Sequence, residues 1–241
     1  NAASPTQYGS TVAIGNVVVS PSEFMPRLFA ENGRLLDSQG RITLDTPEAL
    51  RALENYRETY SYSDRTIYDF WKNALEGFAD GTAAMTVVFI NYASHILNSQ
   101  MSRIAGKLGF APVPGGKPLL GGGVIGITQS CTCPAAACKF LEWLYADLVA
   151  PVFTMLGGLS PCRSAYSNRD ISEQYPWLST ARKSFPTAQR RSNSTYYQNF
   201  SELQLETILA AHVQQAVLGV CSPEEALKQA QEDCNRYFQP W

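Results

Sequence analysis

Strand and helix signals alternate along the first half of the chain, and this alternation limits the fold more than any other pattern in the sequence. The β-branched run from Thr11 predicts a buried strand over Val12–Val19. A helix start follows at once, with Ser20 as its N-cap, Pro21 in the first turn and Glu23 at the capping-box position. Repetition of this order predicts an α/β architecture.

The same patterns predict the remaining elements as far as residue 145. Further strands are expected at 83–89, 107–116 (ending in a Pro/Gly turn) and 122–128, and a hairpin at 34–44 that turns at 38–40. Helices are expected from Thr46 onward with Leu50, Leu53 and Tyr56 on one face, at 67–80, from about residue 91, and at 134–145.

The helix at 67–80 should bury Phe70, Trp71, Ala74, Leu75 and Phe78 and stop at Gly81. After residue 145 the sequence predicts helices only, separated by loops at 157–163 and 186–194.

Composition excludes several classes of protein. Hydrophobic residues make up 45% of the 241 residues and charged residues 17%, which is unlike a disordered chain. The 19 basic and 21 acidic residues give a net charge of −2, which argues against binding to nucleic acid through phosphate neutralisation. The longest apolar runs, 12–19 and 124–128, are too short to cross a bilayer. Residues 1–10 are expected to be a tag or linker.

The six cysteines do not form an obvious metal or disulfide pattern. They are Cys131, Cys133, Cys138, Cys162, Cys221 and Cys234. The last two flank a predicted helix of ~20 Å, whereas a disulfide needs Cα atoms within about 7 Å. The first three lack zinc-finger spacing, and the chain has only two histidines. The thiols are therefore interpreted as free and packed as small apolar groups, with no metal site and no cofactor.

Sequence motifs for catalysis are also missing. Residues 121–126 match the Gly-x-Gly-x-x-Gly pattern, but they run into a predicted strand instead of opening the helix that a dinucleotide site requires. The paired carboxylates Glu224-Glu225 and Glu232-Asp233 are interpreted as the solvated face and acidic first turn of the last helix. No catalytic residue is assigned, and the chain is not expected to be an enzyme.

The order of several motifs resembles that of the family 1 extracellular solute-binding proteins, which are receptors of ABC importers for sugars and related solutes. The matching segments are 26–33, 45–48, 78–85, 109–116, 121–127, 135–144, 159–163 and 222–230. The resemblance implies a periplasmic-binding-protein-like (type II) fold and extends over residues 11–238. These residues would form the second, C-terminal lobe with additional C-terminal helices that pack toward a missing first lobe. An uncovered apolar surface would then favour a homodimer of the fragment.

Positions that match the ligand-binding loops of the family are candidate site residues. They are Ser22, Glu23, Phe89, Asn91, Tyr92, Gly121, Gly122, Gly123, Tyr197 and Asn199. In the family, aromatic faces stack on sugar rings while amides and carboxylates bind hydroxyl groups. Two plainer interpretations stay open: Glu23 as a capping-box residue, and Tyr196 and Phe200 as core residues. The segment 89–92 has no Trp, so no specific sugar is predicted.

Two functions follow from the resemblance and the cysteines. The first is binding of a small polar solute, preferably a carbohydrate, as the substrate-binding component of an ABC importer outside the cytoplasm. Its partners would be the solute and the permease subunits, without direct binding to nucleic acid. The alternative is the ligand-sensing domain of an intracellular regulator or signalling protein, because six unpaired cysteines are typical of a reducing compartment.

Overall fold

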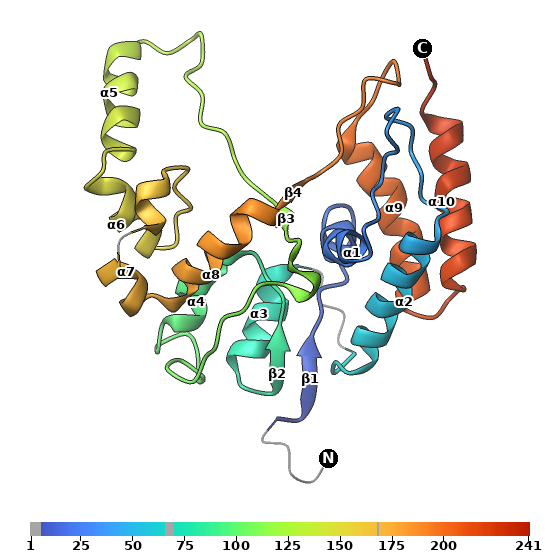
Figure 1. Ribbon diagram of the computed structural model, residues 1–241, viewed down its shortest axis with the longest axis horizontal. Helices are drawn as coiled ribbons and strands as arrows, with labels where there is room; N and C mark the ends of the chain where they lie inside the picture. The colour runs from blue at the N-terminus through green and yellow to red at the C-terminus, as the bar shows by residue number, and fades with distance from the viewer. Residues whose placement is uncertain (1–5, 66–69, 168) are drawn as a thin grey trace. The chain divides into compact units, whose positions relative to one another are not determined.

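The chain divides into two compact units. The computed structural model describes residues 6–65, 70–167 and 169–241 (Figure 1). Unit 1 comprises Asn1–Val88, Val113–Leu120 and Thr187–Trp241, and unit 2 comprises Phe89–Pro112 and Gly121–Pro186. The backbone therefore passes from one unit to the other four times.

Unit 1 contains the longest helices and two short parallel sheets. In chain order its elements are β1 (Tyr8–Thr11), α1 (Val19–Ala30), α2 (Pro47–Ser61), α3 (Trp71–Ala79), β2 (Ala83–Thr86), η2 (Pro114–Gly116), β3 (Leu119–Leu120), β4 (Gln189–Arg190), α9 (Glu202–Val217) and α10 (Pro223–Tyr237). Strand β1 pairs with β2 and aligns Tyr8 with Ala83 and Thr11 with Thr86. Strand β3 pairs with β4. The short η4 (Phe185–Thr187) lies where the chain re-enters this unit.

The core of unit 1 lies among four helices, α1, α2, α9 and α10, which lie side by side in Figure 1. Phe24, Leu53, Leu205 and Leu227 contribute one fully buried side chain from each of these helices. Three of the helices begin at a hydroxyl residue that accepts a hydrogen bond from the first turn: Thr46 for α2, Ser201 for α9 and Ser222 for α10. The acidic first turn expected of the last helix is present in α10.

The start of α1 differs from the prediction. No strand covers Val12–Val19; β1 ends at Thr11, and a turn at 16–18 leads into α1 at Val19. Val12 and Ile14 are buried as predicted, but the turn ends the extended run before it can pair further. The helix has no side-chain cap, because its N-cap is Val18; Ser20 lies in the first turn, and its hydroxyl donates to the Gly15 carbonyl oxygen at 2.6 Å. The predicted capping box is therefore wrong.

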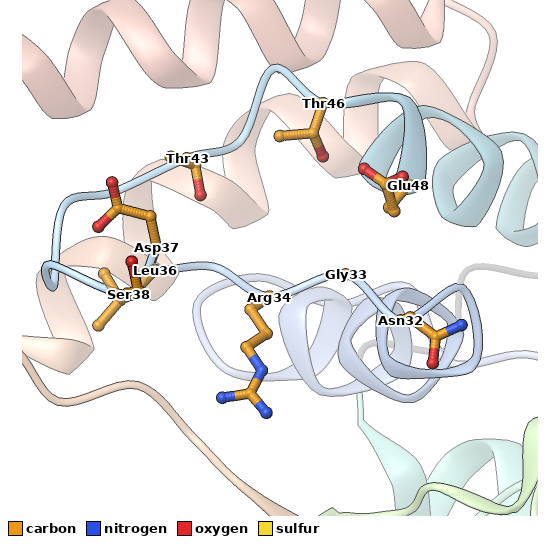
Figure 2. A pocket seen from close by; sticks show the side chains of 9 residues that line it. All are labelled: Asn32, Gly33, Arg34, Leu36, Asp37, Ser38, Thr43, Thr46 and Glu48. Atoms are coloured by element: carbon orange, nitrogen blue, oxygen red, sulfur yellow. The ribbon is translucent and has the colours of Figure 1, made fainter.

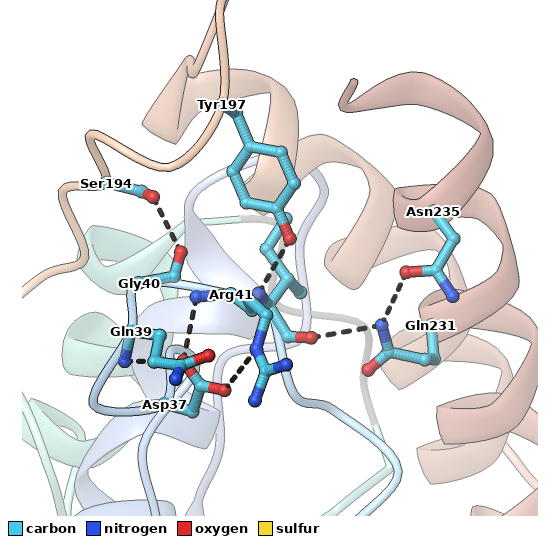
Figure 3. A network of polar contacts seen from close by, with 9 residues as sticks. Asp37, Gln39, Gly40, Arg41, Ser194, Tyr197, Gln231 and Asn235 are labelled. Atoms are coloured by element: carbon cyan, nitrogen blue, oxygen red, sulfur yellow. Dashed lines mark hydrogen bonds and ion pairs between the residues drawn. The ribbon is translucent and has the colours of Figure 1, made fainter. Parts of the chain in front are cut away.

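The predicted hairpin at 34–44 is confirmed. Leu36 and Ile42 form an antiparallel bridge, and the turn between them contains Gly40. Figure 3 shows how distant side chains hold this hairpin: Ser194 donates to the Gly40 carbonyl oxygen at 2.6 Å, and Gln231 donates to the Ile42 carbonyl oxygen at 3.1 Å.

The predicted helix at 67–80 is observed as α3, from Trp71 to Ala79. Residues 67–69 lie outside the described residues. Four residues of the expected apolar face are buried: Trp71, Ala74, Leu75 and Phe78. Phe70 is exposed, because it is the N-cap and lies before the first helical turn. The strand expected at 83–89 is shorter and ends at Thr86, where its pairing with β1 ends.

Unit 2 is built from short helices. They are η1 (Ile90–Tyr92), α4 (Ala93–Leu97), α5 (Pro134–Leu144), α6 (Val149–Met155), η3 (Arg163–Tyr166), α7 (Arg169–Gln174) and α8 (Pro176–Ser184). Its core is small and centres on Trp177 and Leu178, which pack with Ala93, Ala150, Ala165, Tyr166 and Ala181. The helices expected near residue 91 and at 134–145 are confirmed.

The strands predicted at 107–116 and 122–128 are wrong. The first segment is irregular apart from η2, and the second is irregular and exposed throughout. A strand needs a hydrogen-bonded neighbour, and the described residues supply none to either segment. Three strands of the described residues were missed. Strand β1 ends where the predicted strand was to begin, and β3 and β4 form by pairing with each other.

The described part of the chain is mainly helical, with two small parallel sheets in place of the larger sheet that the α/β prediction implies. None of its helices combines the length and the apolar character needed to cross a membrane.

Candidate functional site

In unit 2 the structure brings together two of the predicted ligand-binding segments. After β2 the chain continues to Phe89 and η1, and the Phe89 ring lies beside Gly121. A Cβ atom on Gly121 would be 3.0 Å from the Phe89 Cε1 atom, so a side chain at this position would require the ring to shift. We call Gly121, Gly122 and Gly123 the glycine strip. All three are exposed, and a Cβ on Gly122 or Gly123 would meet nothing within 4 Å.

The residues that follow Phe89, in η1 and α4, lie against the loop that contains Gly157. Gly157 has a φ of 95°, and a Cβ there would lie 2.4 Å from the Ser94 hydroxyl oxygen. The Ser94 hydroxyl in turn donates to the Asn91 carbonyl oxygen at 3.4 Å. Only glycine tolerates both the positive φ at this position and the short distance to Ser94. Ser94 and Gly157 were not predicted as site residues. The predicted loop at 157–163 was the sequence feature that pointed to this position of the chain.

The chemistry of this group suits an uncharged polar solute. The Asn91 side chain is exposed and has no hydrogen-bond partner among the described residues. Tyr92 is half-buried, and burial raises the pKa of its hydroxyl, which keeps it a neutral donor. Together with the Phe89 ring and the bare backbone of the glycine strip, they offer an aromatic face, an amide and a hydroxyl. No carboxylate belongs to this set of residues, so it offers no general acid or base of that type.

The predicted site residues of unit 1 have internal partners instead. Ser22 is buried and its hydroxyl accepts a hydrogen bond from Arg191 Nη2 at 2.9 Å. Glu23 is buried as well, its carboxylate lies 3.0 Å from Arg27 Nη1, and burial raises its pKa. This ion pair, rather than a capping box, is the structural role of Glu23.

Tyr197 and Asn199 differ from each other. The hydroxyl of buried Tyr197 accepts the Ile42 backbone N–H at 2.9 Å (Figure 3). Its ring packs with Phe200 and Phe238, so Phe200 belongs to the packing around the core, whereas Tyr196 is exposed. The Asn199 side chain is exposed. Among the four predicted residues of unit 1, only Asn199 is open to solvent.

A pocket of about 400 Å³ is also found in unit 1, between the segment after α1 and the start of α2 (Figure 2). Its lining residues are Asn32, Gly33, Arg34, Leu36, Asp37, Ser38, Thr43, Thr46 and Glu48. The lining has no aromatic ring, the Asp37 carboxylate already binds Arg41, and Thr46 caps α2. The backbone N–H of Arg41 lowers the pKa of Asp37. This pocket therefore offers fewer free groups to a sugar than the group in unit 2.

The cysteines and acidic residues give no sign of a metal centre. All six cysteines are free, and Cys234 is fully buried on α10, where burial raises its pKa to about 12. Within the part of the chain that the structure describes, no three His, Cys, Asp or Glu side chains gather as metal ligands would. Residues 121–126 open no helix, since the next one begins at Pro134, so the dinucleotide geometry is not present there.

Comparison with known proteins identifies the family. The profile of the family described as bacterial extracellular solute-binding protein matches residues 5–180. The chain belongs to this family. The membership confirms the family resemblance and the expectation that the chain is not an enzyme, since the family consists of solute-binding proteins.

Solved structures of solute-binding proteins share the fold. Maltose-bound MalE3 from Thermotoga maritima matches 94% of this chain with a TM-score of 0.79 and 22% identity. A solute-binding protein from Agrobacterium radiobacter K84 in complex with ribitol matches 96% with a TM-score of 0.75 and 21% identity. A third, from Thermotoga lettingae with bound α-D-tagatose, matches 95% with a TM-score of 0.70 and 25% identity.

These structures confirm a periplasmic-binding-protein-like fold. The match covers 60%, 60% and 59% of the three neighbours, so this chain spans about 60% of the length of the solute-binding proteins that it resembles.

Proposed function

We propose that the chain is part of the substrate-binding component of an ABC importer and binds an uncharged polar solute, a carbohydrate or a polyol. The observation that carries this proposal is the Phe89 ring beside Gly121 of the glycine strip, with Asn91 and Tyr92 following Phe89 in η1, in a chain of the solute-binding family. The ligands named for the structural neighbours, maltose, ribitol and tagatose, support the same class of solute.

The proposed solute contacts follow from this group. The Phe89 and Tyr92 rings would face the apolar side of a sugar, and the Asn91 amide and the backbone of the glycine strip would bind its hydroxyl groups. The permease subunits would be the protein partners, and the site of action would be outside the cytoplasm.

We also propose that residues 11–238 form the second lobe and helices that pack toward a first lobe. On α5 the large rings of Phe140 and Trp143 are exposed, and Val124 and Ile125 in the preceding irregular segment are exposed as well. Such an apolar surface is costly to leave in water. Further chain, of the kind that the longer neighbours contain, would cover it.

A second candidate function is a ligand-sensing domain inside the cell. The observation in its favour is that all six cysteines are free, with Cys133 and Cys138 exposed. An oxidising compartment would tend to pair or modify such thiols. The upstream sequence discriminates the two: a lipoprotein signal supports import, and a helix-turn-helix supports regulation.

The proposal is tested by following the melting temperature of the chain with maltose, ribitol and D-tagatose at millimolar concentration. A bound solute raises the melting temperature by mass action. Asn91→Ala should weaken binding of the active solute about fivefold, because one hydrogen bond is lost. Asn193→Ala is the matched control, since Asn193 is exposed in unit 1 and outside the group. Failure of all three solutes, or equal binding by Asn91→Ala and the wild type, would contradict the proposed site.

A further inference from the structure

Arg191, at the start of the segment that follows β4, contacts two other elements of unit 1. Arg191 comes directly after β4, and its guanidinium contacts two helices. On α9 it forms an ion pair with Glu206 and lies 3.7 Å from the Glu202 carboxylate, measured from Nε to Oε1. On α1 its Nη2 donates to the Ser22 hydroxyl oxygen at 2.9 Å. One side chain thus joins β4, α1 and α9.

The Glu206 carboxylate depends on this arginine. Glu206 is 2% exposed, and burial raises its pKa to about 6 despite the opposing effect of Arg191. Glu202 is partly buried beside the same guanidinium, and its pKa is raised as well. A buried carboxylate without a partner is strongly unfavourable, so the pair resists separation once it has formed.

The β3–β4 sheet next to this arginine is too short to be stable by itself. Strands β3 and β4 pair over two positions, Leu119 with Gln189 and Leu120 with Arg190, with one further hydrogen bond from the Gln189 N–H to the Pro118 carbonyl oxygen at 2.8 Å. Two-stranded sheets are marginal in water even when they are longer. The contacts of Arg191 provide the additional attachment to α1 and α9.

We propose that Arg191 is a positioning residue that fixes the β3–β4 ladder on unit 1 and thereby sets the backbone at the start of the glycine strip. Leu120 is bonded directly to Gly121, so any movement of β3 is transmitted to the first glycine through a single peptide bond. The inference depends on the proposed function only in treating the glycine strip as a ligand contact.

Hydrogen exchange measured by mass spectrometry on the ligand-free chain tests this role. Arg191→Met should increase exchange in peptides that span 117–123 and 187–190 by about tenfold, because the ladder opens locally. Exchange in α2 and α10 should not change. Arg190→Met is the matched control, since Arg190 is exposed and adjacent. Arg191→Lys keeps the charge but not the forked geometry and should give an intermediate increase.

Two results would overturn the proposal. One is unchanged exchange in both peptides in Arg191→Met. The other is an equal increase throughout unit 1, which indicates only general loss of stability. If Arg191→Met does not fold, Glu206→Gln provides the same comparison, since it removes the charge that Arg191 binds while keeping a similar shape.

Solute affinity separates this inference from the proposed function. Faster exchange of the ladder together with weaker binding of the active solute, maltose, ribitol or D-tagatose, supports both. Faster exchange with unchanged affinity supports the role of Arg191 in holding the ladder and contradicts the role of the glycine strip in binding.

Discussion

Among the described residues of unit 1, the carboxylates of Glu23 and Glu206 are buried, and each lies beside an arginine. In both cases burial is the largest influence and raises the pKa, while the neighbouring guanidinium lowers it. The ionised form is therefore less favourable in the folded chain than in the unfolded chain. Such groups make stability depend on pH in a range where ordinary glutamates are fully ionised.

Glu206 should make the folded state more stable as pH falls from about 7 to about 4.5. Its pKa is raised from 4.5 to about 6, so the folded chain binds the proton first in this range. Glu206→Gln should lose this contribution, whereas the neighbouring Arg191 stays charged and Glu202 titrates in both proteins. Urea unfolding of both proteins across this range measures the difference in the free energy of unfolding. Parallel curves for the two proteins would contradict the assignment.

At the level of elements, helices and strands differ in how much they depend on distant partners. Helix α5 forms where Pro134 and the alanines after it predict it, because its hydrogen bonds are internal. The segment at 122–128 has a strand sequence but stays irregular, because strand hydrogen bonds need a second segment. The hairpin at 34–44 was predictable, since both of its arms are close in sequence.

Removal of the cap of α2 should lower the stability of unit 1. Thr46 accepts the Ala49 N–H at 3.2 Å, and Thr46→Ala should cost about 1 kcal/mol of unfolding free energy. Thr59→Ala, in the body of the same helix, is the matched control and should change stability by less than half as much. Urea unfolding followed by circular dichroism measures both. Equal effects of the two substitutions would show that the cap contributes nothing specific.

At the scale of the whole molecule, the chain has two hydrophobic cores of unequal size. The core of unit 1 joins residues from β1 to α10, whereas that of unit 2 contains seven buried residues around Trp177. Small cores give marginal stability. Unit 2 also carries the exposed apolar residues of α5, which would favour association of the isolated chain with further protein.

The two units should unfold in separate steps, with unit 2 first. Leu53→Ala removes a fully buried side chain of unit 1, at a cost of about 2–5 kcal/mol, and should lower only the upper transition. Trp177→Ala should lower the midpoint of the low-temperature transition, or abolish that transition, without changing the other one. Leu203→Ala, at an exposed position, is the control. Differential scanning calorimetry measures the transitions; one joint shift for both core variants would show a single cooperative unit.

Local chemistry along the chain was sufficient to predict most of the helices, the hairpin and the family, but not the cap of α1. Hydroxyl caps such as Thr46 and Ser222 act over three residues, and the ordered motifs preserve the family pattern without any contact between them. Long-range packing was needed for the rest. It places Arg191 between α1 and α9, engages Ser22 and Tyr197 internally, and brings Phe89 against Gly121, because these contacts join residues that are far apart in sequence.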